Sequence, residues 1–308
     1  MSLNKEYERK IDVFLEYLPK RVYNKTAEVE FEGFFTYDRM SLDEALAHKK
    51  EFLPQGLEWG KKWEYGWFFT TVTIPEKCKG QRVVFKTDLS EALAFVNNKV
   101  YGALDRTHKE VTLTRCAKGG EVFEIALEVY AGHDGENPAM LRACNAIFMM
   151  PDEDNSEFPE NVTQQVVKNG EFGIFYDEIF SFYMDMYILK DLLLILDDKS
   201  LRAALVCKAL KKACDAVDIE APFDEFFEMV KAGRKELKPA LEAKNGSSAP
   251  TVYAISHSHL DLEWLWTREE TRRKTARTMG NQLQLLEEFP EHNYIQSQAW
   301  IFNTIKNE

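Results

Sequence analysis

Two histidines and an aspartate alternate along one short stretch of the chain, and their side chains are common zinc ligands. His257, His259 and Asp261 stand at positions i, i+2 and i+4. In an extended backbone, residues at this spacing point to the same side, so we expect the three side chains to face one pocket. Imidazole nitrogen and carboxylate oxygen both coordinate zinc, so their convergence indicates a metal site. A hydrogen-bonded structural role for the histidines is the alternative interpretation.

The residues around this group predict a strand before it and a helix after it. Thr251–Ile255 is apolar and rich in β-forming residues, and it follows a loop-like segment at 245–250. The candidate site would therefore lie at the C-terminal end of a strand, where α/β folds hold their chemistry. Trp264 and Trp266 follow closely, and their indole rings suit either stacking on a sugar or filling a core.

A capped helix is predicted to follow. Thr267–Glu270 fits a capping box, with Thr267 accepting from a first-turn N–H group and Glu270 reaching back. Basic residues lie mostly off the apolar stripe of this helix, and we expect them to form a solvated face: Arg272, Arg273, Lys274 and Arg277. A second strand at 294–298 and a helix from 300 to 305 continue the pattern. This β-α-β-α order predicts the start of a parallel α/β domain.

These residues together resemble the start of the catalytic domain in glycoside hydrolase family 38, whose members are zinc-dependent retaining α-mannosidases. The resemblance is carried by His-Ser-His-x-Asp-x-x-Trp-Leu-Trp at 257–266, then Glu-Thr-Arg-Arg-Lys, Phe-Pro-Glu and Gln-Ser-Gln. It implies that His259 and Asp261 bind Zn²⁺ and that Trp264 lines the mannose pocket. His257 is then expected to orient the site from behind the ligands.

The resemblance also implies that this chain is incomplete as an enzyme. The family's other zinc ligands, an aspartate that is also the nucleophile and a distant histidine, are expected further along a longer protein. No catalytic residue is therefore assigned within these 308 residues, which we expect to be inactive alone.

Composition narrows the possible partners. The chain is 45% hydrophobic and 29% charged, as in soluble globular proteins, and its formal charge of −12 argues against nucleic-acid or anionic-membrane partners. Its longest apolar runs are too short to span a bilayer. Residues 1–24 show no signal peptide, and the 5 cysteines form no CxxC pair, so we expect reduced thiols and a cytoplasmic location.

Changes in hydrophobic period predict four regions. They are an N-terminal helix within 1–26, a β-sandwich over 27–150, a helical bridging segment over 151–249 and a truncated α/β catalytic domain over 250–308. Alternation over Phe123–Val129 predicts a half-buried strand, and Asn97–Asn98 suits a tight hairpin. By resemblance to bacterial-type family 38 enzymes, the sandwich is expected to be a galactose-binding jelly roll and the last region to begin a barrel-like α/β domain.

The predicted function is release of α-linked mannose from glycans or oligosaccharides, with homo-oligomerisation of the full-length protein left open. Two alternatives come from other classes. Metal-dependent amidohydrolases also carry His-x-His at the end of a barrel strand, where the metal activates hydroxide. A non-catalytic carbohydrate-binding protein would instead use the sandwich as a lectin and would not need zinc.

Overall fold

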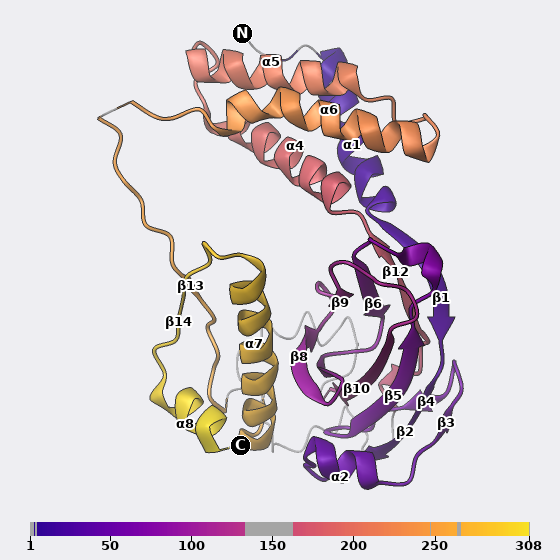
Figure 1. Cartoon of the computed structure of the whole chain (residues 1–308). Coiled ribbons are helices and arrows are strands. Elements are labelled where there is room, and N and C mark those ends of the chain that lie inside the picture. Colours follow the sequence, from indigo (N-terminus) through magenta and orange to yellow (C-terminus); the bar gives the residue numbers. More distant parts are fainter. Residues whose placement is uncertain (1–2, 4, 133–162, 247, 264–265, 308) are drawn as a thin grey trace. The chain divides into compact units, whose positions relative to one another are not determined.

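The computed structural model describes residue 3 and residues 5–132, 163–246, 248–263 and 266–307. The chain forms two compact units (Figure 1). The helical unit comprises Met1–Asn24 and Gly173–Val252, and the sandwich unit comprises Lys25–Phe172 and Tyr253–Glu308. Among the described residues, no helix is both long and apolar enough to cross a bilayer.

The helical unit packs its helices around one core. Its elements are α1 (Lys5–Tyr17), the 3-10 helix η1 (Leu18–Arg21), α4 (Asp177–Ile195), α5 (Leu201–Ala216) and α6 (Phe223–Leu241). Phe14 of α1 packs edge-on against Phe182 of α4, and both join the buried cluster that also holds Leu210 and Phe226. The predicted helices are confirmed, and the N-terminal helix docks on the other helices of this unit.

Two β-sheets form the body of the sandwich unit. The 4-stranded sheet has the order β1-β12-β6-β9 and the 6-stranded sheet has the order β3-β2-β5-β10-β7-β8. In chain order the strands are β1 (Tyr23–Val29), β2 (Phe31–Thr36), β3 (Glu51–Leu53), β5 (Tyr65–Thr73), β6 (Val83–Thr87), β7 (Ala92–Val96), β8 (Lys99–Leu104), β9 (Glu110–Thr114), β10 (Val122–Tyr130) and β12 (Gly170–Phe175). All neighbours in the larger sheet pair antiparallel. Shorter elements connect them: α2 (Leu42–Ala47), β4 (Glu58–Trp59), η2 (Glu76–Cys78) and β11 (Gln165–Val166).

Aromatic side chains fill the space on both faces of the larger sheet. Phe31 of β2 contacts Phe68 of β5 and also Phe85 of β6, so it bridges the two sheets. On the opposite face of β5, Trp67 and Phe69 belong to a second buried cluster, against which α2 packs. These rings are core residues, because burial of their apolar area is worth more than exposure to solvent. The boundary expected at residues 150–151 lies outside the described residues. The expectation of a helical segment from residue 151 is wrong for 165–175, because β11 pairs with β4 and β12 lies between β1 and β6.

The hairpin between β7 and β8 turns at Asn97 and Asn98, as predicted. Their φ angles are 50° and 62°, values that asparagine tolerates better than most residues. The Asn97 carboxamide oxygen also accepts a hydrogen bond from the backbone N–H of Glu124 on β10, at 3.0 Å. The turn is therefore fixed to a third strand.

The C-terminal part of the sandwich unit contains the predicted β-α-β arrangement. Strand β13 (Ser256–His257), helix α7 (Arg268–Glu288), strand β14 (Tyr294–Ile295) and helix α8 (Ala299–Asn307) follow in order. β13 and β14 pair in parallel, with Ser256 opposite Tyr294 and His257 opposite Ile295. The prediction of a strand over Thr251–Ile255 is wrong. This run is exposed, and strand pairing begins only at Ser256.

Candidate functional site

His259 and Asp261 lie together just after β13. The Nε2 atom of His259 is 3.1 Å from Oδ1 of Asp261. The His259 side chain is 84% exposed and the Asp261 side chain is 43% exposed, so a metal ion could reach both. An imidazole and a carboxylate in this arrangement are within reach of one common ion.

The glutamines that follow β14 hold the loop that carries these two side chains. The Gln296 side-chain amide donates to the backbone oxygen of Ser258 at 3.2 Å, and that of Gln298 donates to the backbone oxygen of Leu260 at 2.9 Å. The two bonded carbonyls belong to the residues that alternate with His259 and Asp261. The Gln-Ser-Gln segment therefore fixes the backbone from which both candidate ligands project, a role that the sequence reasoning did not assign.

The other predicted site residues are placed differently. His257 lies on β13 with an exposed side chain. Across the described part of the chain, no cluster of three or more His, Cys, Asp or Glu side chains is arranged to hold a metal. The structure thus brings His259 and Asp261 together without adding His257 to them. Trp264 lies outside the described residues.

These donors fit half of a zinc site. Zinc in proteins usually has four ligands in a tetrahedral arrangement, and imidazole nitrogen with carboxylate oxygen is a common part of that set. His259 and Asp261 would hold the ion from one side. The remaining ligands would have to come from other parts of the protein.

A hydroxyl group ties the end of the motif to the start of α7. The Thr271 Oγ1 atom accepts from the indole N–H of Trp266 at 3.1 Å and from the backbone N–H of Glu263 at 3.2 Å. The same hydroxyl donates to the backbone oxygen of Thr267 at 3.1 Å. Thr267 caps the helix by accepting from the backbone N–H of Glu270. The loop after Asp261 is thus anchored to the first turn of α7.

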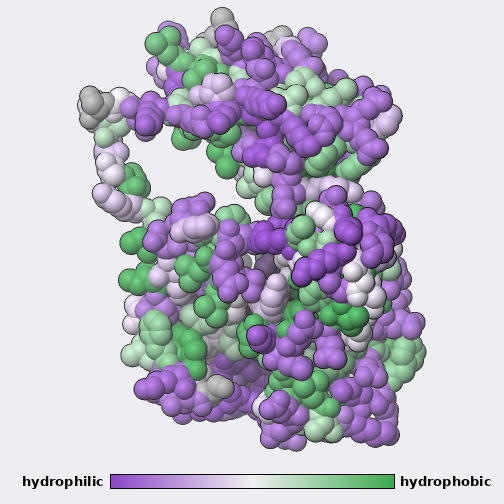
Figure 2. Space-filling view, in the orientation of Figure 1, coloured by the Kyte–Doolittle hydropathy of each residue, from purple (hydrophilic) through white to green (hydrophobic). Residues whose placement is uncertain are grey.

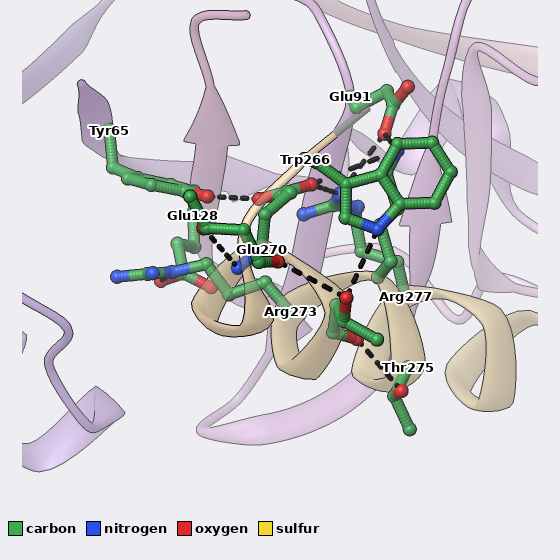
Figure 3. A network of polar contacts seen from close by, with 11 residues as sticks. Tyr65, Glu91, Glu128, Trp266, Glu270, Arg273, Thr275 and Arg277 are labelled. Carbon is green, nitrogen blue, oxygen red and sulfur yellow. Dashed lines mark hydrogen bonds and ion pairs between the residues drawn. The ribbon is translucent and has the colours of Figure 1, made fainter. Parts of the chain in front are cut away.

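The expected reciprocal half of the capping box is wrong, because the Glu270 carboxylate is used elsewhere. The Glu270 side chain is buried, with 1% of the residue exposed. Its carboxylate accepts a hydrogen bond from the Tyr65 hydroxyl of β5 and forms an ion pair with Arg277, about two helical turns further along α7 (Figure 3). A buried carboxylate gains more from a guanidinium and a phenol than from one backbone amide.

The expected solvated basic face of α7 is wrong as well. Arg273 and Arg277 are 5% and 6% exposed, because this face of the helix packs on β7 and β8 of the larger sheet. The Arg273 Nε atom is 3.0 Å from Glu128 Oε1 on β10, and its guanidinium lies 3.7 Å from the centre of the Tyr65 ring. Figure 3 shows these side chains meeting between the helix and the strands.

Glu91 and Lys274 extend the ionic network towards the motif. Glu91, just before β7, pairs with Lys274 at 3.0 Å and with Arg277 at 3.1 Å. The Lys274 ammonium also lies 4.7 Å from the centre of the Trp266 ring, a cation–π contact with the last motif residue. The first turns of α7 are therefore joined both to the sandwich and to the motif.

The pKa values of Glu128 and Glu91, the two sandwich carboxylates in this network, shift in opposite directions. Burial raises the pKa of Glu128, although the adjacent Arg273 opposes that shift. Burial also acts to raise the pKa of Glu91, but Arg277 and Lys274 outweigh it, so that pKa lies below its ordinary value. The half-buried strand expected over Phe123–Val129 is buried on both faces from Ile125 onwards, because α7 packs on the face that holds Glu128.

The face of α7 that points away from the sandwich is apolar and exposed. Leu283 is 59% exposed, and Leu286 and Phe289 are exposed too. Exposed apolar residues on the neighbouring elements continue this surface: Ile295 on β14, and Phe302 and Ile305 on α8. Figure 2 shows hydrophobic side chains gathered over this part of the sandwich unit. The side of α7 that faces the sandwich is thus polar, and its C-terminal turns expose apolar residues to solvent, whereas its first turn exposes Arg268 and Glu269.

A cavity of about 660 Å³ lies between the motif and the sandwich, within the same unit. His259, Leu260 and Trp266 line it from the motif, and Lys274 and Asn281 line it from α7. The sandwich contributes Glu91, the loop residues 105–107, and Gln164 with Gln165. One candidate zinc ligand therefore faces a space that the sandwich helps to enclose.

Two protein-family models match the chain. The N-terminal domain of the glycosyl hydrolases of family 38 matches residues 249–308, which hold the motif, α7 and β14. The jelly roll domain of α-mannosidases matches residues 26–159, which hold most of the sandwich strands. Over residues 249–308 the chain is similar to glycosyl hydrolases of family 38, and its sandwich is similar to the jelly roll of α-mannosidases. Because the two matched regions meet at α7, the buried ionic network joins the family 38 domain to the jelly roll.

Two α-mannosidases are similar to this chain over most of its length. It is 26% identical over 267 residues to α-mannosidase G of Dictyostelium discoideum, covering 82% of this chain and 22% of that protein. It is 25% identical over 282 residues to α-mannosidase 2C1 of Homo sapiens, covering 89% of this chain and 25% of that protein. The chain thus spans about a quarter of the length of these relatives.

Solved structures resemble this chain more distantly. A β-glucuronidase of Faecalibacterium prausnitzii aligns with a TM-score of 0.31 and 13% identity, over 50% of this chain and 32% of that one. A likeness of this size supports no conclusion about fold or activity.

Proposed function

We propose that this chain supplies part of the active site of a zinc-dependent retaining α-mannosidase that releases mannose from oligosaccharides. The observation that carries the proposal is the contact between His259 and Asp261, 3.1 Å apart, directly after a strand paired in parallel with β14. The similarity of residues 249–308 to glycosyl hydrolases of family 38 gives this pair its chemical context.

In this proposal, His259 and Asp261 provide two of the zinc ligands. Trp264 lines the mannose pocket and His257 orients the site from behind the ligands. Bound zinc would act as a Lewis acid and a template for sugar hydroxyls. A retaining glycosidase needs a carboxylate nucleophile and a general acid about 5–5.5 Å apart, and both are assigned to parts of the longer protein.

The exposed apolar face of α7 supports the proposal that a larger domain surrounds this site. Residues such as Leu283 and Phe302 are more than half exposed, and contiguous apolar surface of this kind is normally covered. Since the matched relatives are about four times longer, we infer that the rest of a barrel-like α/β domain packs on this face. The cytoplasmic location and a homo-oligomeric assembly stay predictions.

The test is hydrolysis of an aryl α-mannoside by the complete gene product, with and without a chelator. We expect the chelator to abolish turnover and zinc to restore it. His259→Ala and Asp261→Asn should each abolish turnover and lower the bound zinc, measured by elemental analysis, because each removes one ligand. His48→Ala, at an exposed histidine of the jelly roll, is the matched control and should behave like the parent.

The alternatives give different results in the same assay. A zinc-loaded parent that does not hydrolyse the mannoside would contradict the proposal and direct attention to amide substrates. Sugar binding that survives removal of residues 250–308 and does not need zinc would indicate a carbohydrate-binding protein instead.

The isolated 308-residue chain gives a separate test. Complete structural zinc sites in finger peptides contribute about 10–16 kcal/mol of binding free energy, which depends on a closed set of four ligands. With two ligands, we expect weak zinc binding and no turnover. Tight stoichiometric zinc in this chain would contradict the assignment of the other ligands elsewhere.

A further inference from the structure

We propose that the jelly roll forms one wall of the substrate site and binds the sugar on the leaving-group side of the scissile mannoside. The cavity between the motif and the sandwich is the place of this subsite. The inference rests on the proposed mannosidase function, because it uses His259 to locate the reacting mannose.

The position of the cavity is the first argument. His259 and Trp266 line it from the motif, while residues 105–107, between β8 and β9, line it from the sandwich. If His259 helps to hold the ion that grips the reacting mannose, a space that reaches His259 is adjacent to that sugar. Its volume of about 660 Å³ lies within the range of about 300–1,000 Å³ that is typical of ligand pockets.

The chemistry of the lining suits a neutral sugar. Two side-chain amides that line the cavity are held in place: the Gln165 Nε2 atom donates to the backbone oxygen of Ala131 at 2.8 Å, and the Asn281 Oδ1 atom accepts from the backbone N–H of Ala103 at 2.7 Å. Fixed polar groups of this kind orient a ligand at little entropic cost. The indole of Trp266 adds an apolar plane beside them.

The charges in the cavity largely compensate one another. Glu91 pairs with Lys274 and Arg277, and Arg277 pairs with Glu270 as well, so these two cations meet two carboxylates. Asp105 and Arg106 add one further charge of each sign to the lining. The cavity therefore favours an uncharged polyhydroxyl compound over a phosphate or a carboxylate. A glycan leaving group has that chemistry.

The sandwich loop at the cavity is rigid where it would contact the ligand. The Asp105 carboxylate accepts from the backbone N–H and the hydroxyl of Thr107 and from the backbone N–H of His108, each at 2.7 Å. The backbone N–H of Asp105 donates to the backbone oxygen of His108 at 2.8 Å. This closed turn presents Arg106 and Thr107, both exposed, at the cavity.

The experiment compares two substrates with the complete enzyme. One is an aryl α-mannoside, whose leaving group is small, and the other is an α-linked mannobiose, whose leaving group is a sugar. The variants are Arg106→Ala and Thr107→Tyr: the first removes a hydrogen-bond donor and the second fills the cavity. Lys118→Ala, at an exposed cation of the same jelly roll that does not line the cavity, is the control.

For Arg106→Ala we expect kcat/KM for mannobiose to fall about tenfold, the effect of losing roughly one good hydrogen bond. Thr107→Tyr should lower it at least as much, because the phenol occupies the space of the leaving-group sugar. The aryl mannoside should change less than about twofold, because it makes few contacts beyond the mannose. Equal effects on both substrates, or no effect on either, would overturn the inference. A parent that hydrolyses neither substrate would instead overturn the proposed function.

Discussion

The pair of Glu128 and Arg273 provides the sharpest test of how the family 38 domain is joined to the jelly roll. Its nitrogen and oxygen atoms are 3.0 Å apart, and the Arg273 and Glu128 side chains are 5% and 8% exposed. Glu128→Ala would leave a buried guanidinium without its counter-ion, a change that costs about 3–5 kcal/mol in buried pairs. Arg273 keeps its contacts with the Tyr65 ring and the backbone oxygen of Asp38, so we expect a loss of about 3 kcal/mol.

The matched control is an exposed pair on the same sandwich. Lys109 and Asp88 are 2.7 Å apart, but their side chains are 46% and 57% exposed. Exposed pairs contribute about 0–1 kcal/mol, so Asp88→Ala should change the free energy of unfolding by less than about 1 kcal/mol. The difference between the two variants measures what burial adds to the pair.

Urea unfolding followed by tryptophan fluorescence is a suitable assay for this chain. All 6 tryptophans belong to the sandwich unit, so the signal reports on that unit rather than on the helical one. Glu128→Ala should lower the midpoint with an unchanged slope. If it lost no more stability than Asp88→Ala, the network would not hold α7 to the sandwich and the reasoning would be refuted.

Three further predictions concern the same unit. Glu91→Gln should destabilise the fold at neutral pH. Because the pKa of Glu91 is lowered in the folded state, its ionised carboxylate stabilises the fold above the ordinary glutamate pKa, and this stabilisation is lost as pH falls through the folded pKa. The free energies of unfolding of parent and variant should therefore converge in acid. Gly33→Ala should cost about 3 kcal/mol in urea unfolding, because a Cβ would collide with the backbone oxygen of Trp67. Asn98→Ala should lower the free energy of unfolding by about 1 kcal/mol because of its φ of 62°, and Asn98→Gly should restore it.

Local patterns predicted much of this fold because local physics decides those parts. Helical period predicted a helical segment that contains α4, α5 and α6, and the paired asparagines predicted the β7–β8 turn. Spacing and family resemblance together located His259 and Asp261, since both follow the same strand end. Each of these features is determined by residues that are close together in the chain, so it can be predicted from the sequence alone.

The environment of α7 was not predictable in the same way. A helix with arginines on one side and leucines on the other indicates that the arginines face water, and here they face Glu128 and Glu91 from a distant part of the chain. The signal that pointed to this was weak: Glu128 stands among apolar residues in a strand, where an isolated carboxylate needs a partner. Choosing that partner required knowing which helix covers the strand.

The ionic character of this interface has a consequence for the metal motif. Hydrogen bonds between charged groups form at only one position of α7 along the sheet, whereas apolar contacts tolerate small shifts of the helix. Since Thr271 and Lys274 hold Trp266, a shift of α7 would move the end of the motif. We therefore expect the double variant Glu128→Leu with Arg273→Met to recover most of the stability that Glu128→Ala loses, because apolar replacement of a whole buried pair is often neutral. In the complete enzyme, the same variant should bind zinc at least several-fold more weakly, measured by competition with a chelator. If stability and zinc affinity both matched the parent, the network would serve stability alone and would not set the place of His259 and Asp261.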